Sequence, residues 1–159
     1  MIRVEKIGLL LFSVAMFGCG GVPSPKTATG TWRAVMTSTT NQAGKPGEQA
    51  VLFVTLQQHG KTLEATVSNV LQESSCFPTD TLRGTTLKGQ VILPGGEAMS
   101  NLQLSGLLNP SGGIAIMLSM TGAMQPDANS SAGMFTLNPS LSACAIGTGT
   151  FEMTRMPML

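Results

Sequence analysis

From residue 30 onward, apolar and polar residues alternate in short runs, and most of these runs end near a glycine or a proline. The run at residues 62–70 alternates most clearly, with apolar side chains on one side and threonine, glutamate and serine on the other. An alternation of period two places every second side chain on the same face of a β-strand. A more apolar run at residues 50–58 precedes it across a turn at residues 58–61, so the two runs predict a β-hairpin.

The same pattern predicts further strands at residues 30–39, 81–87, 90–93, 101–108, 114–121, 133–138 and 147–155. The runs at residues 81–87 and 90–93 are predicted to form another hairpin, with its turn at Lys88 and Gly89. Loops are predicted at residues 41–49, 71–79 and 122–132, where glycine, proline and polar residues gather.

Consecutive antiparallel strands joined by short turns predict an all-β meander of about eight or nine strands. The meander is either closed as a small barrel or folded as a β-sandwich, and closure is favoured because it removes exposed strand edges. Glycine, serine, threonine and asparagine are plentiful, and all four are weak helix formers. No amphipathic helix of useful length is predicted after residue 21.

Charge is sparse, with 11% of the residues charged and no run of one sign. A nucleic-acid-binding surface needs a basic stripe to meet phosphates, so nucleic acid is excluded as a partner. A basic patch for an anionic membrane is not predicted either. The many leucine, valine, isoleucine, methionine and phenylalanine residues predict a packed core rather than a disordered chain.

The first 18 residues have the parts of a secretory signal peptide. Arg3 and Lys6 precede an apolar stretch at residues 7–17, and the small residue Gly18 follows it. The apolar stretch is eleven residues long, whereas a helix needs roughly 20 residues to cross a bilayer. Residues 1–18 are therefore predicted to form a helical signal peptide of an exported protein, not a permanent transmembrane helix.

The junction Met16-Phe17-Gly18-Cys19 resembles a bacterial lipobox, the site of signal peptidase II. The resemblance implies that the sulfur of Cys19 receives a diacylglycerol, that the chain is cut before Cys19, and that the new amino group is acylated. Two or more acyl chains give stable anchoring, so we expect a lipid anchor on a bacterial envelope membrane. Gly20, in place of an aspartate, is similar to the outer-membrane signal of enteric bacteria.

The exported chain then divides into a tether and one domain. Residues 19–29 comprise the lipidated cysteine and a segment rich in glycine, proline and serine, which is predicted to be flexible. Residues 30–159 have the length of a single domain with its own core, and are too few for two domains.

Cys76 and Cys144 remain once Cys19 carries lipid. A cysteine pair in an exported protein is most simply a disulfide, which in the chain-entropy model stabilises a loop of this length by about 4 kcal/mol. Two buried thiols are the alternative. A metal site is not predicted, because zinc prefers four closely spaced ligands and His59 is the only histidine. No cofactor is expected.

The start of the first predicted strand, Gly30-Thr31-Trp32, and Arg155 near the end of the last one resemble the calycin pattern of lipocalins and avidin-like barrels. The resemblance implies that Trp32 closes one end of the barrel and that Arg155 packs over its ring, a cation–π contact of about 0.5–2 kcal/mol. The chain has no tyrosine, which the second lipocalin motif needs. The resemblance therefore implies the barrel architecture but identifies no ligand. The same start, with the later cysteines and a Gly-Thr-Phe closing strand, resembles uncharacterised bacterial envelope lipoproteins.

Candidate catalytic residues are isolated in the sequence. His59 lies in a predicted turn with no nucleophile pattern beside it, and no Gly-x-Ser-x-Gly motif occurs. Two glutamates could act as a catalytic acid and base only if folding brought them into one cleft. The candidates are Glu64, Glu73, Glu97 and Glu152. We therefore expect a protein that is not an enzyme.

Methionines gather in the second half of the chain, at positions 117, 120, 124, 134 and 153. Methionine fills gaps in cores and also lines adaptable binding surfaces; core packing is the favoured interpretation, and pocket lining is the alternative.

Two functions follow from this organisation. The first is a non-catalytic, membrane-anchored envelope lipoprotein whose barrel binds a small apolar ligand. The second is an interaction module with a filled core, whose loops at residues 41–49 and 122–132 contact other envelope proteins. A cavity of roughly 300 Å³ or more favours the ligand, whereas a filled core with an exposed apolar patch favours a protein partner.

Overall fold

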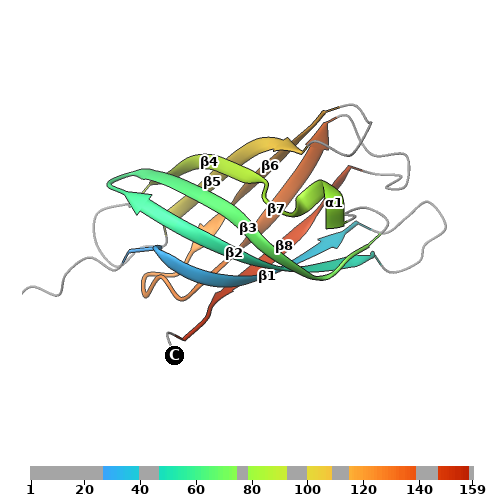
Figure 1. Cartoon of the computed structure of the whole chain (residues 1–159). Coiled ribbons are helices and arrows are strands. Elements are labelled where there is room, and N and C mark those ends of the chain that lie inside the picture. The colour runs from blue at the N-terminus through green and yellow to red at the C-terminus, as the bar shows by residue number, and fades with distance from the viewer. Residues whose placement is uncertain are drawn as a thin grey trace, which may run out of the picture.

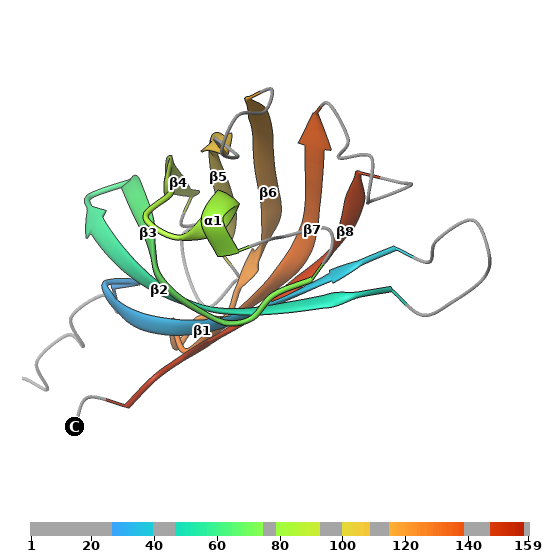
Figure 2. The same ribbon diagram turned by 45° about the vertical axis from the view of Figure 1, so that its right-hand side comes forward.

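The computed structural model describes residues 27–39, 47–74, 79–92, 100–108, 115–138 and 147–157 of the protein. In this part of the chain, eight antiparallel strands follow one another around a closed barrel (Figures 1 and 2). The strands are β1 (Gly30–Ser38), β2 (Gln49–His59), β3 (Thr62–Gln72), β4 (Thr86–Ile92), β5 (Ser100–Leu108), β6 (Ile116–Met124), β7 (Ser130–Asn138) and β8 (Thr148–Arg155). A short helix, α1 (Thr79–Leu82), lies between β3 and β4. The all-β barrel prediction is confirmed, and the sandwich alternative is excluded.

The barrel closes where β1 pairs with β8. Trp32 lies opposite Arg155 in this ladder, and Ser38 lies opposite Gly149. With this pairing each of the eight strands has a neighbour on both sides, so no long strand edge is left for another chain to join.

The two ends of the barrel differ, and we name them by what lies there. At one end, which we call the mouth, β3 ends, α1 follows and β4 begins (Figure 2). At the opposite end, which we call the base, residues 27–29 enter β1 and residues 156–157 follow β8. In an up-and-down barrel, β5 and β7 end at the mouth, and the β2–β3 and β6–β7 turns lie at the base.

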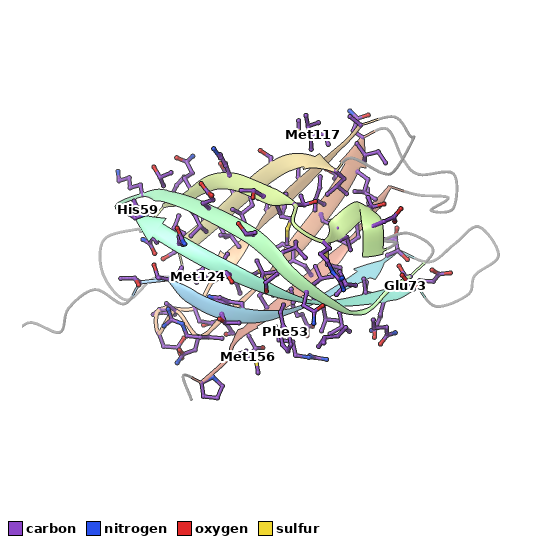
Figure 3. The ribbon with its side chains drawn as sticks, in the orientation of Figure 1. Phe53, His59, Glu73, Met117, Met124 and Met156 are labelled. Carbon is purple, nitrogen blue, oxygen red and sulfur yellow. The ribbon has the colours of Figure 1, made fainter. Side chains whose placement is uncertain are left out.

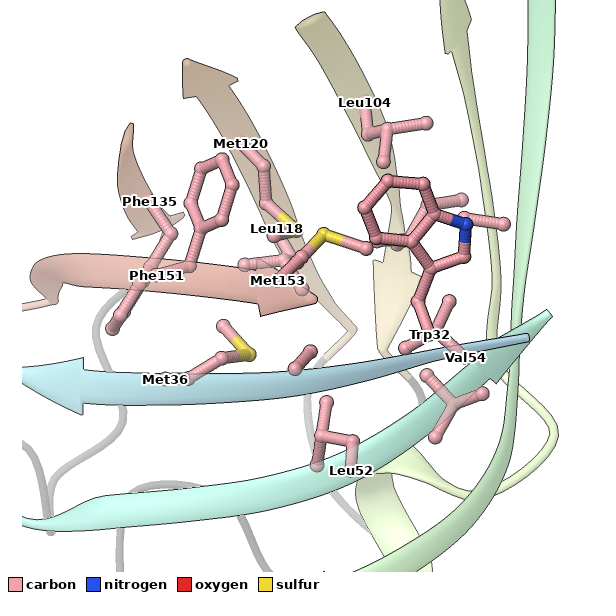
Figure 4. Packing of buried hydrophobic residues seen from close by; sticks show 14 of the residues in the cluster. Trp32, Met36, Leu52, Val54, Leu104, Leu118, Met120, Phe135, Phe151 and Met153 are labelled. Carbon is pink, nitrogen blue, oxygen red and sulfur yellow. The ribbon is translucent and has the colours of Figure 1, made fainter. Parts of the chain in front are cut away.

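The core fills the inside of the barrel with every second side chain of each strand. Figure 4 shows Phe135, Phe151 and Met36 packed toward the side of the interior opposite Trp32. Burial of apolar surface, worth about 25 cal/mol per Å², is the main force that holds this single core together. The largest fully buried side chains are Trp32, Phe135, Phe151, Met36, Leu56, Leu63, Leu82, Leu102, Leu108, Met153 and Val91.

The predicted hairpin with a turn at Lys88 and Gly89 is wrong. Both residues lie inside β4 and pair with residues of β5, while Thr81, predicted to begin a strand, belongs to α1. Gly89 serves close packing rather than a turn, because a Cβ atom there would lie 1.8 Å from the carbonyl oxygen of Gln103. Glycine inside a strand often marks such a close approach of two backbones.

The loop predicted at residues 122–132 is also wrong over most of its length. β6 continues to Met124 and β7 begins at Ser130, so only residues 125–129 connect them. Gly122, where the predicted loop began, lies opposite Gly133 in the ladder. The ring of Phe151 covers both glycines, since a Cβ atom at either position would approach it to within 3 Å.

A second aromatic ring packs on a glycine in the same wall of the barrel. Phe135 on β7 lies directly opposite Gly149 on β8. A Cβ atom at Gly149 would lie 2.4 Å from Cζ of Phe135 and 2.2 Å from the carbonyl oxygen of Thr37. The glycine therefore leaves the space that the phenylalanine ring occupies.

Gly149→Val is expected to lower the free energy of unfolding by about 2 kcal/mol or more, because the added methyl groups overpack the wall. Urea or thermal unfolding followed by circular dichroism measures the loss. Thr150→Val is the matched control, since Thr150 is exposed on the same strand and should change stability by less than about 0.5 kcal/mol. Equal stability of the two variants would contradict this account of Gly149.

Candidate functional site: the barrel interior and its two ends

The interior of the barrel is nearly filled by its own side chains. The cavity among the described residues has a volume of about 20 Å³ and an apolar surface, with Met36, Met120 and Met153 in its walls. Pockets for drug-sized ligands measure about 300–1,000 Å³. The space is large enough for roughly one water molecule, but it presents no polar group to bind one.

The short helix α1 closes the interior at the mouth. Leu82 is fully buried, lies in the wall of the small cavity, and is joined by the buried residue Thr81. The backbone N–H of Gly84 donates to the carbonyl of Val67 at 2.9 Å, which attaches the end of this segment to β3. Arg83 adds a hydrogen bond from Nη2 to Oδ1 of Asn69 at 3.3 Å.

Sequence reasoning missed α1, although one signal for it is present. Gly84 has a φ of 78°, the left-handed conformation in which glycine commonly follows the last residue of a helix. A four-residue helix shows no amphipathic periodicity, so its local signs are this glycine and the acidic Asp80 in the first turn. The closing role of Leu82 depends on contacts with strands that are distant in the sequence.

At the base, the structure brings together the two residues that the calycin resemblance pairs. The guanidinium carbon of Arg155 lies 5.6 Å from the centroid of the Trp32 ring. Trp32 is fully buried, and its indole N–H donates to the carbonyl of Ala28 at 2.9 Å. Nη2 of Arg155 also donates to the carbonyls of Thr27 and Thr29, each at 2.5 Å.

Gln58 of β2 completes this cluster. Its side-chain Oε1 accepts a hydrogen bond from the backbone N–H of Ala28 at 2.7 Å, and its own backbone N–H donates to Oγ1 of Thr29 at 3.0 Å. We call Trp32, Gln58 and Arg155 the base clamp, because side chains from β1, β2 and β8 together hold residues 27–29 across the base. The role of Gln58 was not predicted, since nothing in its local sequence indicates a partner 30 positions away.

The three cysteines lie outside the described residues. The lipid anchor expected at Cys19 and the disulfide expected between Cys76 and Cys144 therefore stay predictions.

The candidate catalytic residues remain separate in the structure. His59 is exposed at the end of β2, near the base, and Glu73 is exposed at the mouth (Figure 3). Glu64 on β3 and Glu152 on β8 are exposed on strands that are not neighbours, and Glu97 lies outside the described residues. Across the described segments, no group of three or more histidine, cysteine, aspartate or glutamate side chains could hold a metal ion.

The five methionines divide between the core and the outer wall. Met120, Met124 and Met153 are buried inside the barrel, as the core interpretation predicts. Met117 and Met134 face outward and are 39% and 60% exposed. Met117 lies directly opposite Leu107, which is 53% exposed, so these two form an exposed apolar pair on β5 and β6 near the mouth.

The comparisons with known proteins found no match for this chain among protein-family models, curated proteins or solved structures. Within the described residues, no helix has the length and hydrophobicity needed to cross a bilayer.

Arg155→Lys is expected to loosen the base clamp while keeping the positive charge. Lysine cannot reproduce the planar fork that contacts the ring and both carbonyls, so we expect a loss of about 1–2 kcal/mol in unfolding free energy. Hydrogen exchange at the Ala28 amide, which bonds to Gln58, should become faster. Arg33→Lys, at an exposed position on β1, is the control; an unchanged exchange rate at Ala28 in Arg155→Lys would contradict the clamp.

Proposed function

We propose that this protein is a non-catalytic lipoprotein of the bacterial cell envelope, anchored in the outer membrane through Cys19, whose rigid barrel contacts other envelope proteins. The lipobox-like junction supports the anchor. The closed and filled barrel supports a structural or interaction role rather than the carriage of a ligand.

The observation that carries this choice is the volume of the interior. The cavity of about 20 Å³ is more than tenfold smaller than the roughly 300 Å³ at which ligand pockets begin. A ligand of drug size would have to displace core side chains, and core packing in proteins is already as dense as in organic crystals. Contacts with other molecules are therefore assigned to the outer surface.

On that surface, the Leu107–Met117 pair is the first candidate for a protein contact. Both side chains are exposed and adjacent across β5 and β6, and methionine adapts its shape to different partners. The loop proposed for contacts at residues 122–132 is no longer a candidate, because most of it forms β6 and β7. The loop at residues 41–49 lies largely outside the described residues.

The disulfide between Cys76 and Cys144 is part of the proposal, and the topology supports it. Cys76 belongs to the connection between β3 and α1, and Cys144 belongs to the connection between β7 and β8. Both connections leave the described barrel at the mouth, from strands separated by three others in either direction. A disulfide here would link opposite sides of the mouth next to α1.

A second candidate function is an apolar ligand site that Leu82 occupies in the present structure. The cavity beneath Leu82 is apolar and has three methionines in its walls. In the described part of the chain, hydrogen bonds to Val67 and Asn69 of β3 attach the turn after α1 to the barrel. Displacement of the Leu82 side chain would enlarge this cavity toward the mouth.

Native mass spectrometry of the full-length protein, purified gently from its host, separates the two functions. We expect the mass of the acylated polypeptide without a bound small molecule. This mass should be two hydrogens below that of the reduced chain, because a disulfide removes one hydrogen from each thiol. Leu82→Ala, which enlarges the cavity, should also carry no ligand if the barrel is only a rigid body. A bound molecule of defined mass in the natural protein would contradict the interaction role of a filled barrel. It would support the second candidate, the apolar ligand site.

Cys19→Ser should abolish labelling by radioactive palmitate and shift the protein to a soluble or unprocessed form, because the thioether and the acylated amino group are lost. Cell fractionation and gel autoradiography check both effects. Cys76→Ser is the matched control and should keep its acyl label. An unchanged membrane fraction for Cys19→Ser would contradict the lipid anchor.

A further inference from the structure

The base clamp determines where the tether meets the barrel. Ala28 is 1% exposed, and the backbone of residues 27–29 is bonded to Gln58, Trp32 and Arg155. These bonds come from three different strands, so the segment cannot swing to the side of the barrel without breaking the clamp. Any chain that leads from Cys19 must therefore enter the barrel at the base.

The length of the tether limits how the barrel can turn. The eight peptide steps from Cys19 to Thr27 reach at most about 28 Å, even when fully extended. Strands of this length, tilted as in an eight-stranded barrel, give a height of about 25 Å. A barrel with its mouth on the bilayer would need an almost fully extended tether along its whole height.

We propose that the base is the surface that faces the lipid headgroups, and that the mouth points away from the membrane. This inference rests on the proposed anchor at Cys19. It assigns the membrane as the partner of the base, and it leaves α1 and the Leu107–Met117 pair on the side that other envelope molecules can reach.

Resonance energy transfer to the bilayer tests this orientation in the full-length, acylated protein. A single fluorescent amino acid is placed at Asp127 in the base, at Asp80 in the mouth or at Met134 on the wall between them; all three positions are exposed. The proteins are reconstituted into phosphatidylethanolamine–phosphatidylglycerol vesicles that contain a rhodamine-labelled lipid. The base and mouth labels each replace one aspartate, so the change in charge is matched.

Transfer efficiency is expected to be largest from position 127, intermediate from position 134 and smallest from position 80. Equal or reversed efficiencies, in proteins that float with the vesicles, would overturn the orientation and leave the lipid anchor intact. Failure of the acylation-competent protein to float would instead overturn the anchor, and the orientation would fall with it. Flotation of the labelled proteins is therefore measured first, with Cys19→Ser as the control that should stay unbound.

Discussion

Pairing of β1 with β8 turns a meander of eight strands into a closed body, and the other features of the fold depend on that closure. Without it, two long strands would each leave a row of backbone groups unpaired. Closure also joins the first described segment of the chain to the last, because Trp32 and Arg155 lie opposite each other in this ladder. The hydrogen bonds of Arg155 then extend the join to residues 27–29.

A closed barrel of this size has little room to spare, and glycine decides where the large side chains go. Phe151 lies over Gly122 and Gly133, and Phe135 lies over Gly149. These pairs let two phenylalanine rings fill one side of the interior while Trp32 lies at the base (Figure 4). The remaining cavity of about 20 Å³ is a consequence of this packing, and it moves the candidate function from the inside of the barrel to its surface.

The two ends of the barrel carry different chemistry because different chain segments close them. The base is closed by a tryptophan and an arginine that are held by hydrogen bonds to the backbone. Within the described segments, the buried leucine of a four-residue helix covers the interior at the mouth. The entering chain is attached at the base, so the mouth is the end that is free to meet other molecules in the proposed envelope setting.

The sequence by itself determined the class of fold and most of the strands, because a two-residue alternation is a local signal. The Trp32–Arg155 pair was expected from the resemblance to the calycin pattern, and the closure of β1 on β8 brings the two residues together. The lipid anchor and the disulfide stay sequence-based expectations. The sequence did not determine the filled interior, the role of Gln58 or the helix that carries Leu82, since each depends on side chains from distant strands. The glycines at positions 89 and 122 show the physical reason: a glycine that makes a turn and a glycine that makes room for a neighbour look the same in sequence, and only the packed neighbours distinguish them.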